Sequence, residues 1–341
     1  SSSHGEDVLE VLRDKNKLNA IVASIGSGQK AVNPRYKHYK EIMDRFDANQ
    51  KVKVFNQSFG SDISMAEFGY GRIENLKANL APGVSYWTGR TDNEGDLIYN
   101  FYTKTVKDNG GLFVWAAGNR KNSRGVSLPV YDASIQAGLP KFTPELEKGW
   151  IAAVGIQKER DNMLNVHYKE HLAYPGQAAW WSISADGDTI HKENSYGYIT
   201  YGIGSSFAAP RVSAAASLVA EKYDWMTADQ VRQTLFTTTD RTEIYKGTVD
   251  TKNELAMRNT VYEPDTKYGW GMLNTNRALK GPGAFINILS QYKNEQNANN
   301  TFNANITSGT YYFENDIYGN GGLNKSGAGT LHLTGNNTYT G

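Results

Sequence analysis

The chain has 341 residues, of which 39% are hydrophobic and 34 are glycine, enough for one large α/β domain plus an appendage. Its 36 basic and 35 acidic residues leave a net charge of +1, which argues against nucleic acid or an anionic membrane surface as a partner. Without cysteine there is no disulfide or thiolate metal site, and no apolar run reaches the roughly 18 residues of a membrane-spanning helix. Both ends interrupt a pattern, so we expect a fragment of a longer protein that does not carry its own signal peptide.

A helix is predicted at the start of the chain. Glu6 and Asp7 fill its first turn, and apolar residues recur over residues 8–12. His4 lies at the mouth of this helix. On local features alone, a single histidine in such a place is more often a surface residue than a catalytic one.

Strands and helices then alternate along the chain. The predicted buried strands are residues 19–25, 51–56, 112–117 and 149–155, and the predicted helices are residues 35–49 and 93–109, the second ended by Asp108-Asn109-Gly110-Gly111. This alternation predicts an α/β fold with a mostly parallel sheet and crossover helices. Ligands bind beyond the carboxyl ends of the strands in such sheets, so chemistry should cluster there.

Small and polar residues follow two of these strands. Ser58-Phe59-Gly60 comes after the strand at 51–56, and Gly118-Asn119 comes after the strand at 112–117. From local sequence alone, the first segment fits a plain exit from strand to loop equally well. An asparagine after glycine at a strand end is usually a turn residue.

The most informative stretch is residues 201–220. Glycines and serines are followed by a run of Ala, Val and Leu that predicts a buried helix, with Pro210 near its start. Ser206 then lies at a helix N-terminus, where free N–H groups and the positive end of the dipole favour negative charge. Local features leave two roles open for Ser206, a helix cap and an acyl-transfer nucleophile.

The segment Gly204-Ser205-Ser206-Phe207-Ala208-Ala209-Pro210 resembles the nucleophile motif of subtilisin-like serine proteases, the subtilases, which is usually Gly-Thr-Ser-x-Ala-x-Pro. Other segments resemble family motifs in family order: His4-Gly5-Glu6-Asp7-Val8, Ser58-Phe59-Gly60, Ala116-Ala117-Gly118-Asn119, Ala173-Tyr174-Pro175-Gly176 and Tyr268-Gly269-Trp270-Gly271-Met272-Leu273-Asn274. The resemblance covers residues 4–283 and implies a subtilisin-like fold over a domain of residues 1–283.

The resemblance also implies roles for individual residues. Ser206 would be the nucleophile, His4 the general base, and Asn119 the side chain that donates to the oxyanion together with the Ser206 backbone N–H. The backbone of Ser58, Phe59 and Gly60 would pair with an extended substrate. The pocket for the residue before the scissile bond would have one wall made of Ala116, Ala117 and Gly118.

The catalytic Asp of subtilases precedes the histidine, and only three residues precede His4. The resemblance therefore implies that this Asp lies on a strand upstream of the chain. A missing central strand would leave its neighbour with unpaired backbone groups. We therefore expect residues 1–341 by themselves to be poorly folded and nearly inactive.

The composition changes after residue 283. Residues 284–305 are predicted to be an Asn-rich linker, and residues 306–341 alternate short apolar stretches with Gly, Asn and Thr, as in the rungs of a β-solenoid. The last run, residues 325–341, resembles a repeat from bacterial autotransporter passengers. This implies secretion or cell-surface display, with membrane contact only through a translocator barrel outside this chain. A Gly-rich tail is the alternative.

Several patterns are interpreted as unrelated to catalysis. His167-Tyr168-Lys169-Glu170-His171 fits a zinc-protease pattern but lacks an amphipathic helix, so we predict a solvated strand or loop. Asp186-Gly187-Asp188 is interpreted as a surface turn. The remaining histidines are predicted to be surface residues: His38, His191 and His332. No cofactor is expected, and the sequence does not support a structural calcium ion.

These observations lead to two functional hypotheses. The first is a secreted serine endopeptidase with a Ser-His-Asp triad that acts on protein or peptide substrates. The second is a non-catalytic adhesive or binding passenger with a degenerate protease-like domain. An Asp in the upstream residues favours the first hypothesis, and its absence there favours the second.

Overall fold

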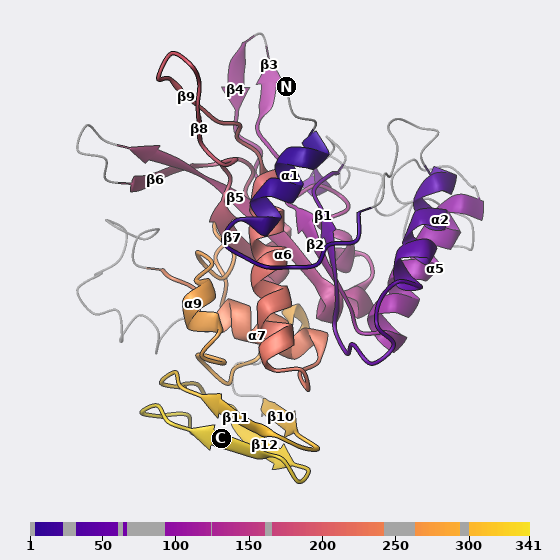
Figure 1. Ribbon diagram of the computed structural model, residues 1–341, viewed down its shortest axis with the longest axis vertical. Helices are drawn as coiled ribbons and strands as arrows, with labels where there is room; N and C mark the ends of the chain where they lie inside the picture. The colour runs from indigo at the N-terminus through magenta and orange to yellow at the C-terminus, as the bar shows by residue number, and fades with distance from the viewer. Residues whose placement is uncertain are drawn as a thin grey trace.

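The computed structural model describes residues 4–22, 32–60, 64–66, 93–123, 125–160, 166–241, 263–293 and 300–341 (Figure 1). Its α/β part is built on a central sheet of four parallel strands and one antiparallel strand. The parallel strands pair in the order β1 (Lys53–Gln57), β2 (Gly111–Ala116), β5 (Trp150–Arg160) and β7 (Ser182–Asp186). The predicted parallel sheet is therefore confirmed.

The antiparallel strand is β6 (Val166–His171), which pairs with the second half of β5. The zinc-like pattern at residues 167–171 therefore lies on a strand, as predicted. Two short hairpins project from the α/β part: β3 (Lys121–Ser123) with β4 (Val126–Leu128), and β8 (Lys192–Glu193) with β9 (Ile199–Thr200).

Helices flank the sheet. They are α1 (His4–Arg13), α2 (Val32–Met43), α5 (Asn93–Asp108), α6 (Ser205–Lys222), α7 (Ala228–Thr237) and α9 (Thr275–Ala278), with 3-10 turns at Leu139–Lys141, Pro144–Gly149, Gly176–Trp181 and Ser290–Tyr292. The longest, α6, contacts all four parallel strands, and α1 packs against α6 (Figure 1). No helix within the described ranges is long and apolar enough to cross a bilayer.

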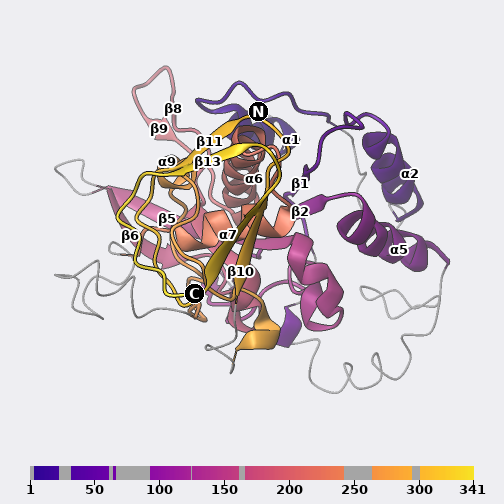
Figure 2. The same cartoon turned by 90° about the horizontal axis from the view of Figure 1, so that it is seen from below.

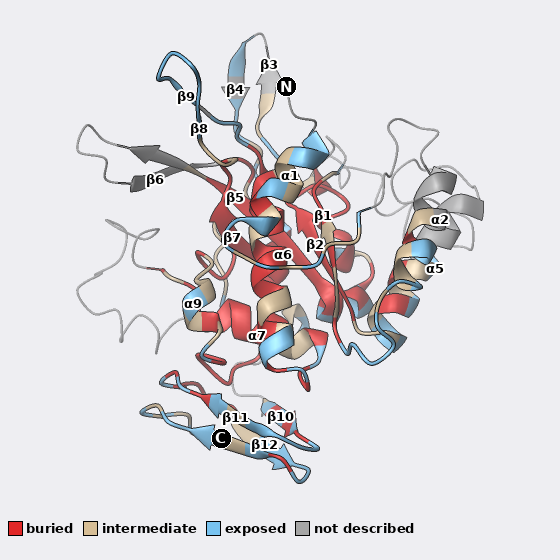
Figure 3. Ribbon diagram, viewed as in Figure 1, coloured by how far each residue is buried: buried red, intermediate tan, exposed pale blue. Residues whose placement is uncertain are grey.

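Local sequence explains why several of these elements form where they do. All six residues of β2 are buried, as expected of an interior parallel strand covered on both faces (Figure 3). After α5 the chain turns at Gly110, whose φ of 67° lies in the left-handed region that glycine tolerates best. Before α7, Thr227 and Gln230 form the predicted capping box, each side chain accepting a hydrogen bond from the other's backbone N–H.

The core between the sheet and α5 is aromatic. Trp115 and Trp150 stack with ring centroids 5.5 Å apart, and Tyr102 meets both of them edge-on. Phe55 and Phe113 stack across β1 and β2 at 4.6 Å. These rings are buried, so they fix β1, β2 and β5 firmly against α5.

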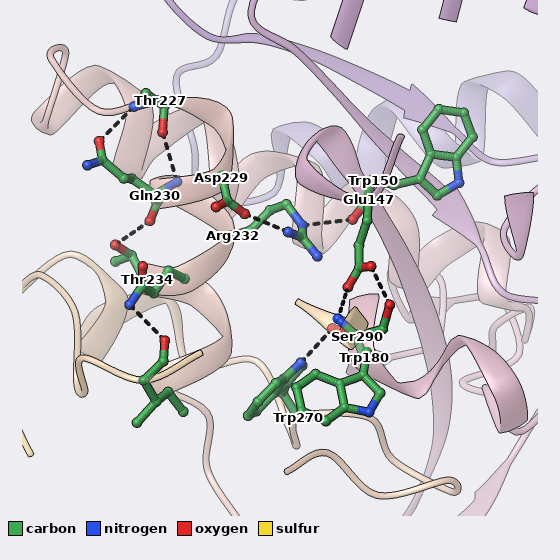
Figure 4. A network of polar contacts seen from close by, with 12 residues as sticks. Glu147, Trp150, Trp180, Thr227, Asp229, Gln230, Arg232, Thr234, Trp270 and Ser290 are labelled. Carbon is green, nitrogen blue, oxygen red and sulfur yellow. Dashed lines mark hydrogen bonds and ion pairs between the residues drawn. The ribbon is translucent and has the colours of Figure 1, made fainter. Parts of the chain in front are cut away.

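A polar network lies beneath the α7 end of the sheet (Figure 4). Arg232 is fully buried; its Nε donates to the Trp150 carbonyl, and its Nη1 donates to Asp229 over 2.7 Å. Glu147 is also buried and accepts hydrogen bonds from the backbone N–H and the hydroxyl of Ser290. Burial raises the pKa of the Glu147 carboxyl, and the nearby Arg232 charge partly opposes that rise.

The predicted strand at residues 19–25 is not formed over residues 19–22, and residues 23–25 lie outside the described part. A strand needs the hydrogen-bonding edge of a neighbour, which an apolar run does not itself supply. Within the described residues, β1 pairs with β2 only, and nothing pairs with its outer edge. The structure thus leaves β1 as an edge strand.

The C-terminal part contains two parallel strand pairs. Strand β10 (Thr301–Asn305) pairs with β12 (Gly322–Ser326), and β11 (Thr310–Phe313) pairs with β13 (Thr330–Leu333). Thr301 lies opposite Gly322, 21 residues later, and Thr310 lies opposite Thr330, 20 residues later.

This part differs from the predicted linker at residues 284–305. Ala284, Phe285 and Ile286 are buried, and the last five residues of the range form β10. The reason is the alternation within β10, where Phe302 and Ala304 turn inward while the neighbouring polar residues face solvent. Composition alone concealed that pattern.

The two parts of the chain are joined by aromatic packing below α7 (Figures 1 and 2). The Trp225 ring lies 6.3 Å from Phe302 and 6.0 Å from Phe313, measured between centroids. Tyr223 donates its hydroxyl to the Tyr312 carbonyl, and burial raises the pKa of that hydroxyl. The first strands after the linker are therefore packed on the α/β part.

Candidate active site

Ser206 is the second residue of α6. The helix N-cap is Gly204, which makes no side-chain cap, and the Ser206 hydroxyl donates instead to the Ser58 carbonyl over 3.1 Å. The capping role left open by the sequence is therefore wrong. Ser206 is partly exposed, and it stands where the first N–H groups of a helix have no intrahelical acceptor.

Pro210 lies further into the helix than the sequence suggested, as the sixth residue of α6. A residue at this position would normally donate its N–H to the Ser206 carbonyl four residues earlier, and proline has no N–H to donate. The Ser58 hydroxyl donates to that carbonyl over 2.7 Å. The missing helical bond is thus replaced by a bond from the end of β1.

His4 is the first residue of α1, and its Nε2 atom lies 3.2 Å from the Ser58 carbonyl oxygen. The hydroxyl of Ser206 and the imidazole of His4 therefore meet at the same oxygen atom. The His4 ring also packs against the Phe207 ring, with centroids 5.7 Å apart. None of the described carboxylates hydrogen-bonds to His4.

Asn119 follows the end of β2 and is held by Ser205. Its Oδ1 atom lies 2.8 Å from the Ser205 backbone nitrogen and 3.0 Å from the Ser205 hydroxyl. A backbone N–H can only donate, so the atom facing it must be the amide oxygen. The Asn119 NH₂ group is thereby the part of the side chain left to donate elsewhere. The Ser205 hydroxyl in turn accepts from Gly118 N–H over 3.1 Å.

The predicted substrate-binding segments follow β1 and β2, which are adjacent. Gln57 pairs with Trp115, so residues 58–60 continue beside residues 116–118 at the carboxyl edge of the sheet. Ser58, Ala116 and Ala117 are buried, whereas Gly60 is exposed. Gly118 has a φ of 128°, a conformation that favours glycine and turns the chain toward Asn119.

The prediction that Asp186-Gly187-Asp188 is a surface turn is wrong. Asp186 is 8% exposed and Asp188 is 1% exposed, because the chain folds back here and the Gly187 carbonyl accepts from Gly204 N–H. Arg211 of α6 donates to the carbonyls of both aspartates. This segment therefore supports the loop that leads into Ser206.

The remaining histidines have mixed outcomes. His191, predicted to be an unpartnered surface residue, lies 3.1 Å from the Asp188 carboxylate and stacks on Tyr201. His38 is next to Glu41 on α2, and His332 stacks on Tyr312. The side chains of His167 and His171 lie outside the described part. The described residues contain no group of three or more acidic or histidine side chains arranged to hold a metal ion.

The sequence reasoning missed three residues that contact this site: Asn56, Ser205 and Ser213. Asn56 and Ser58 are two residues apart at the end of one strand, which places their side chains on the same face of the sheet. That spacing was the available signal for Asn56. Ser213 lies two turns along α6 from Ser206, within a run that reads only as buried helix, so no local pattern marked it.

A family profile described as "Subtilase family" matches residues 17–271, and one described as "Passenger-associated-transport-repeat" matches residues 323–341. Among curated relatives, "Neisserial autotransporter lipoprotein NalP" of Neisseria meningitidis serogroup B is 28% identical over 313 residues, covering 85% of this chain and 25% of the relative. "Serotype-specific antigen 1" of Mannheimia haemolytica is 34% identical over 53% of this chain and 17% of its own length. "Extracellular serine protease" of Serratia marcescens is 28% identical over 68% of this chain and 24% of its own length.

The chain thus spans about a quarter or less of the length of these relatives. Among solved structures, the A-subunit of the AB5 toxin from E. coli matches with a TM-score of 0.47 and 16% identity, covering 81% of this chain and 77% of the other. The prenylagaramide maturation protease PagA matches with a TM-score of 0.45 and 15% identity, covering 82% of each chain.

Proposed function

This chain belongs to the subtilase family, and on that basis we propose that it is the protease domain of a secreted serine endopeptidase, with Ser206 as nucleophile, His4 as general base and Asn119 as oxyanion donor. The observation that carries this proposal is the meeting of the Ser206 hydroxyl and the His4 imidazole at the Ser58 carbonyl oxygen, at 3.1 and 3.2 Å. Two reactive side chains from distant parts of the sequence thereby lie at one point.

In the proposed reaction, the Ser206 hydroxyl turns from the Ser58 carbonyl toward His4 Nε2 when a peptide binds. Its oxygen attacks the peptide carbonyl carbon, and its proton passes to His4. The negative charge that develops on the carbonyl oxygen is stabilised by the Asn119 amide and the Ser206 backbone N–H. His4 then donates the proton to the leaving amine, and water releases the acyl group from Ser206 by the reverse sequence of proton transfers.

We assign the third member of the triad to an aspartate ahead of Ser1, as the order of motifs in the family implies. In that position it would orient the His4 ring and stabilise the imidazolium that forms during attack. The absence of a described carboxylate on His4 fits this assignment.

The substrate would be an extended protein or peptide segment. The backbone of residues 58–60 offers hydrogen-bonding groups beyond the end of β1, as needed for addition of a substrate strand. Ala116, Ala117 and Gly118 line the neighbouring strand end with small side chains, which leaves room for a medium or large apolar residue before the scissile bond. Neither nucleic acid nor a cofactor has a role in this proposal.

The chain is secreted or displayed on the bacterial cell surface, like its autotransporter and extracellular relatives. We propose in addition that residues 301–341 begin a β-solenoid of the passenger, which a translocator barrel elsewhere in the protein would export. The strand offsets of 21 and 20 residues support a repeat of that length. So does the return of the chain end, where Gly341 N–H donates to the Gly321 carbonyl.

The test is labelling of the full-length protein with a fluorophosphonate probe, together with a peptidase assay. Wild type should label and cleave, and Ser206→Ala should do neither while melting at the wild-type temperature. Ser217→Ala, on the same helix, is the control and should behave as wild type. Labelling that persists in Ser206→Ala would overturn the assignment of the nucleophile. Absence of both labelling and cleavage in wild type would favour a non-catalytic binding passenger.

A further inference from the structure

A chain of hydrogen bonds connects the middle of α6 with the start of the same helix by way of β1. The Ser213 hydroxyl donates to Asn56 Oδ1 over 2.9 Å. The Asn56 Nδ2 group donates to the Ser58 hydroxyl oxygen over 2.9 Å. The Ser58 hydroxyl then donates to the Ser206 carbonyl over 2.7 Å. All four residues are buried or partly buried.

The direction of each bond in this chain follows from the last one. The Ser206 carbonyl can only accept, so the single hydroxyl hydrogen of Ser58 must point at it. The Ser58 oxygen must then accept from Asn56, which turns the NH₂ group of Asn56 toward Ser58 and its oxygen toward Ser213. Only one arrangement satisfies every group, so the network holds the Ser58 side chain in one orientation.

The Ser206 carbonyl depends on this network because its own helix does not bind it. Pro210 has no N–H to donate to it, so the usual bond from the next turn of α6 is absent. Ser58 is also the residue whose carbonyl receives the Ser206 hydroxyl and His4 Nε2. A shift of Ser58 would therefore displace both proposed catalytic side chains.

We infer that Asn56 and Ser213 are positioning residues that act through Ser58 to hold the proposed nucleophile Ser206. Asn56 ties the end of β1 to α6, and Ser213 fixes the amide orientation of Asn56. This inference rests on the proposed function, because positioning has meaning only if Ser206 reacts. Neither Asn56 nor Ser213 touches the substrate or the reacting atoms in this account.

The test uses four variants of the full-length protein, each measured for its melting temperature, its rate of fluorophosphonate labelling, kcat and KM. Ser58→Ala removes the hydroxyl that binds Ser206, and Ser58→Thr retains it. Asn56→Leu removes both amide contacts at similar volume, and Ser213→Ala removes only the bond that orients the amide. The matched control is Ser182→Ala, a serine as buried as Ser213 whose hydroxyl binds the Ala178 carbonyl.

Loss of one buried hydrogen bond should slow the reaction about tenfold, the rate equivalent of about 1.4 kcal/mol. We expect this loss in kcat and in labelling rate for Ser58→Ala and Asn56→Leu, and about threefold for Ser213→Ala. KM should stay within about twofold, because the substrate-facing backbone is unchanged. Ser58→Thr and Ser182→Ala should keep the wild-type rates.

Different results separate the two claims. If wild type itself neither labels nor cleaves, the proposed function fails. If wild type reacts and Ser58→Ala, Asn56→Leu and Ser213→Ala label at the wild-type rate, the positioning role is overturned and the function stands. A loss confined to KM, or an equal loss in Ser182→Ala, would also overturn it. If Asn56→Leu does not fold, the two serine variants decide, and their double variant should lose less than the product of the single losses.

Discussion

The side chain of Asn119 accepts two hydrogen bonds from Ser205, one from its backbone N–H at 2.8 Å and one from its hydroxyl at 3.0 Å. Ser205 immediately precedes the proposed nucleophile, so the amide of Asn119 is fixed by the residue next to the one it would assist. Rigid, preorganised donors of this kind stabilise developing charge without reorganising during the reaction. The first prediction follows from this pair.

Asn119→Ala should lower kcat about 10²–10³-fold with little change in KM, the magnitude established for loss of such a donor in the related subtilisin. The reason is that the amide would meet charge that exists only in the transition state. Steady-state kinetics of the full-length protein on a peptide substrate measure the effect. Asn109→Ala, at the other end of β2, is the control. A loss seen mainly in KM would instead assign Asn119 to substrate positioning.

The second prediction concerns the third member of the triad. Residues 1–341 alone should melt less cooperatively than the chain extended upstream through the proposed aspartate, because β1 has an unpaired outer edge among the described residues. The longer chain should also cleave peptides at least about 10³-fold faster, given the cost of losing the triad Asp in subtilisin. Equal melting and equal rates would contradict this, and Asp7 or Asp186 would then be re-examined as the orienting group.

The third prediction is a pH dependence of stability centred on Glu147 (Figure 4). Burial raises the pKa of this carboxyl, so the folded state favours its protonated form. Its contribution to stability is therefore fully present below the ordinary pKa of 4.5 and is lost as pH rises through the raised value. Glu147→Gln should remove this decline while keeping an acceptor for Ser290 N–H. Melting temperatures across that pH range measure it.

The control for this experiment is Glu145→Gln, because Glu145 is an exposed carboxylate in the same 3-10 turn as Glu147. It should keep the wild-type pH profile. A profile of Glu147→Gln that parallels wild type over the whole range would show that the buried carboxylate does not control this part of the stability curve.

The fourth prediction concerns the contact between the α/β part and the C-terminal strands. Trp225→Ala should destabilise the protein by about 3–5 kcal/mol, the usual cost of emptying a large aromatic site in a core. The cavity would open among Tyr223, Phe302 and Phe313, so the C-terminal strands should also become more sensitive to added protease. Chemical denaturation and limited proteolysis measure the two effects.

Tyr312→Ala is the control for Trp225→Ala, since the Tyr312 ring is about half exposed and its backbone carbonyl, which binds Tyr223, is retained. It should cost much less stability. Melting of the α/β part at an unchanged temperature in Trp225→Ala would mean that the two parts unfold independently.

Elements defined by local chemistry were predictable from the sequence. The run Leu112–Ala117 is continuously apolar, so it could only be a buried strand, and the capping box of Thr227 and Gln230 is a three-residue pattern that satisfies its own N–H groups. The segment around Ser206 was recognisable because its small residues and its helix are contiguous. In each case the signal and the structure occupy the same few residues.

Tertiary structure decided the partners of these elements. The burial of Asp188 against His191, the failure of residues 19–22 to form a strand, and the inward alternation of β10 all depend on which distant segment lies opposite. The same holds for the Ser58 carbonyl, where side chains 54 and 148 residues away in sequence arrive at one oxygen. Local sequence determines which backbone and side-chain groups need a hydrogen-bond partner, but only the packed chain determines which residue provides it.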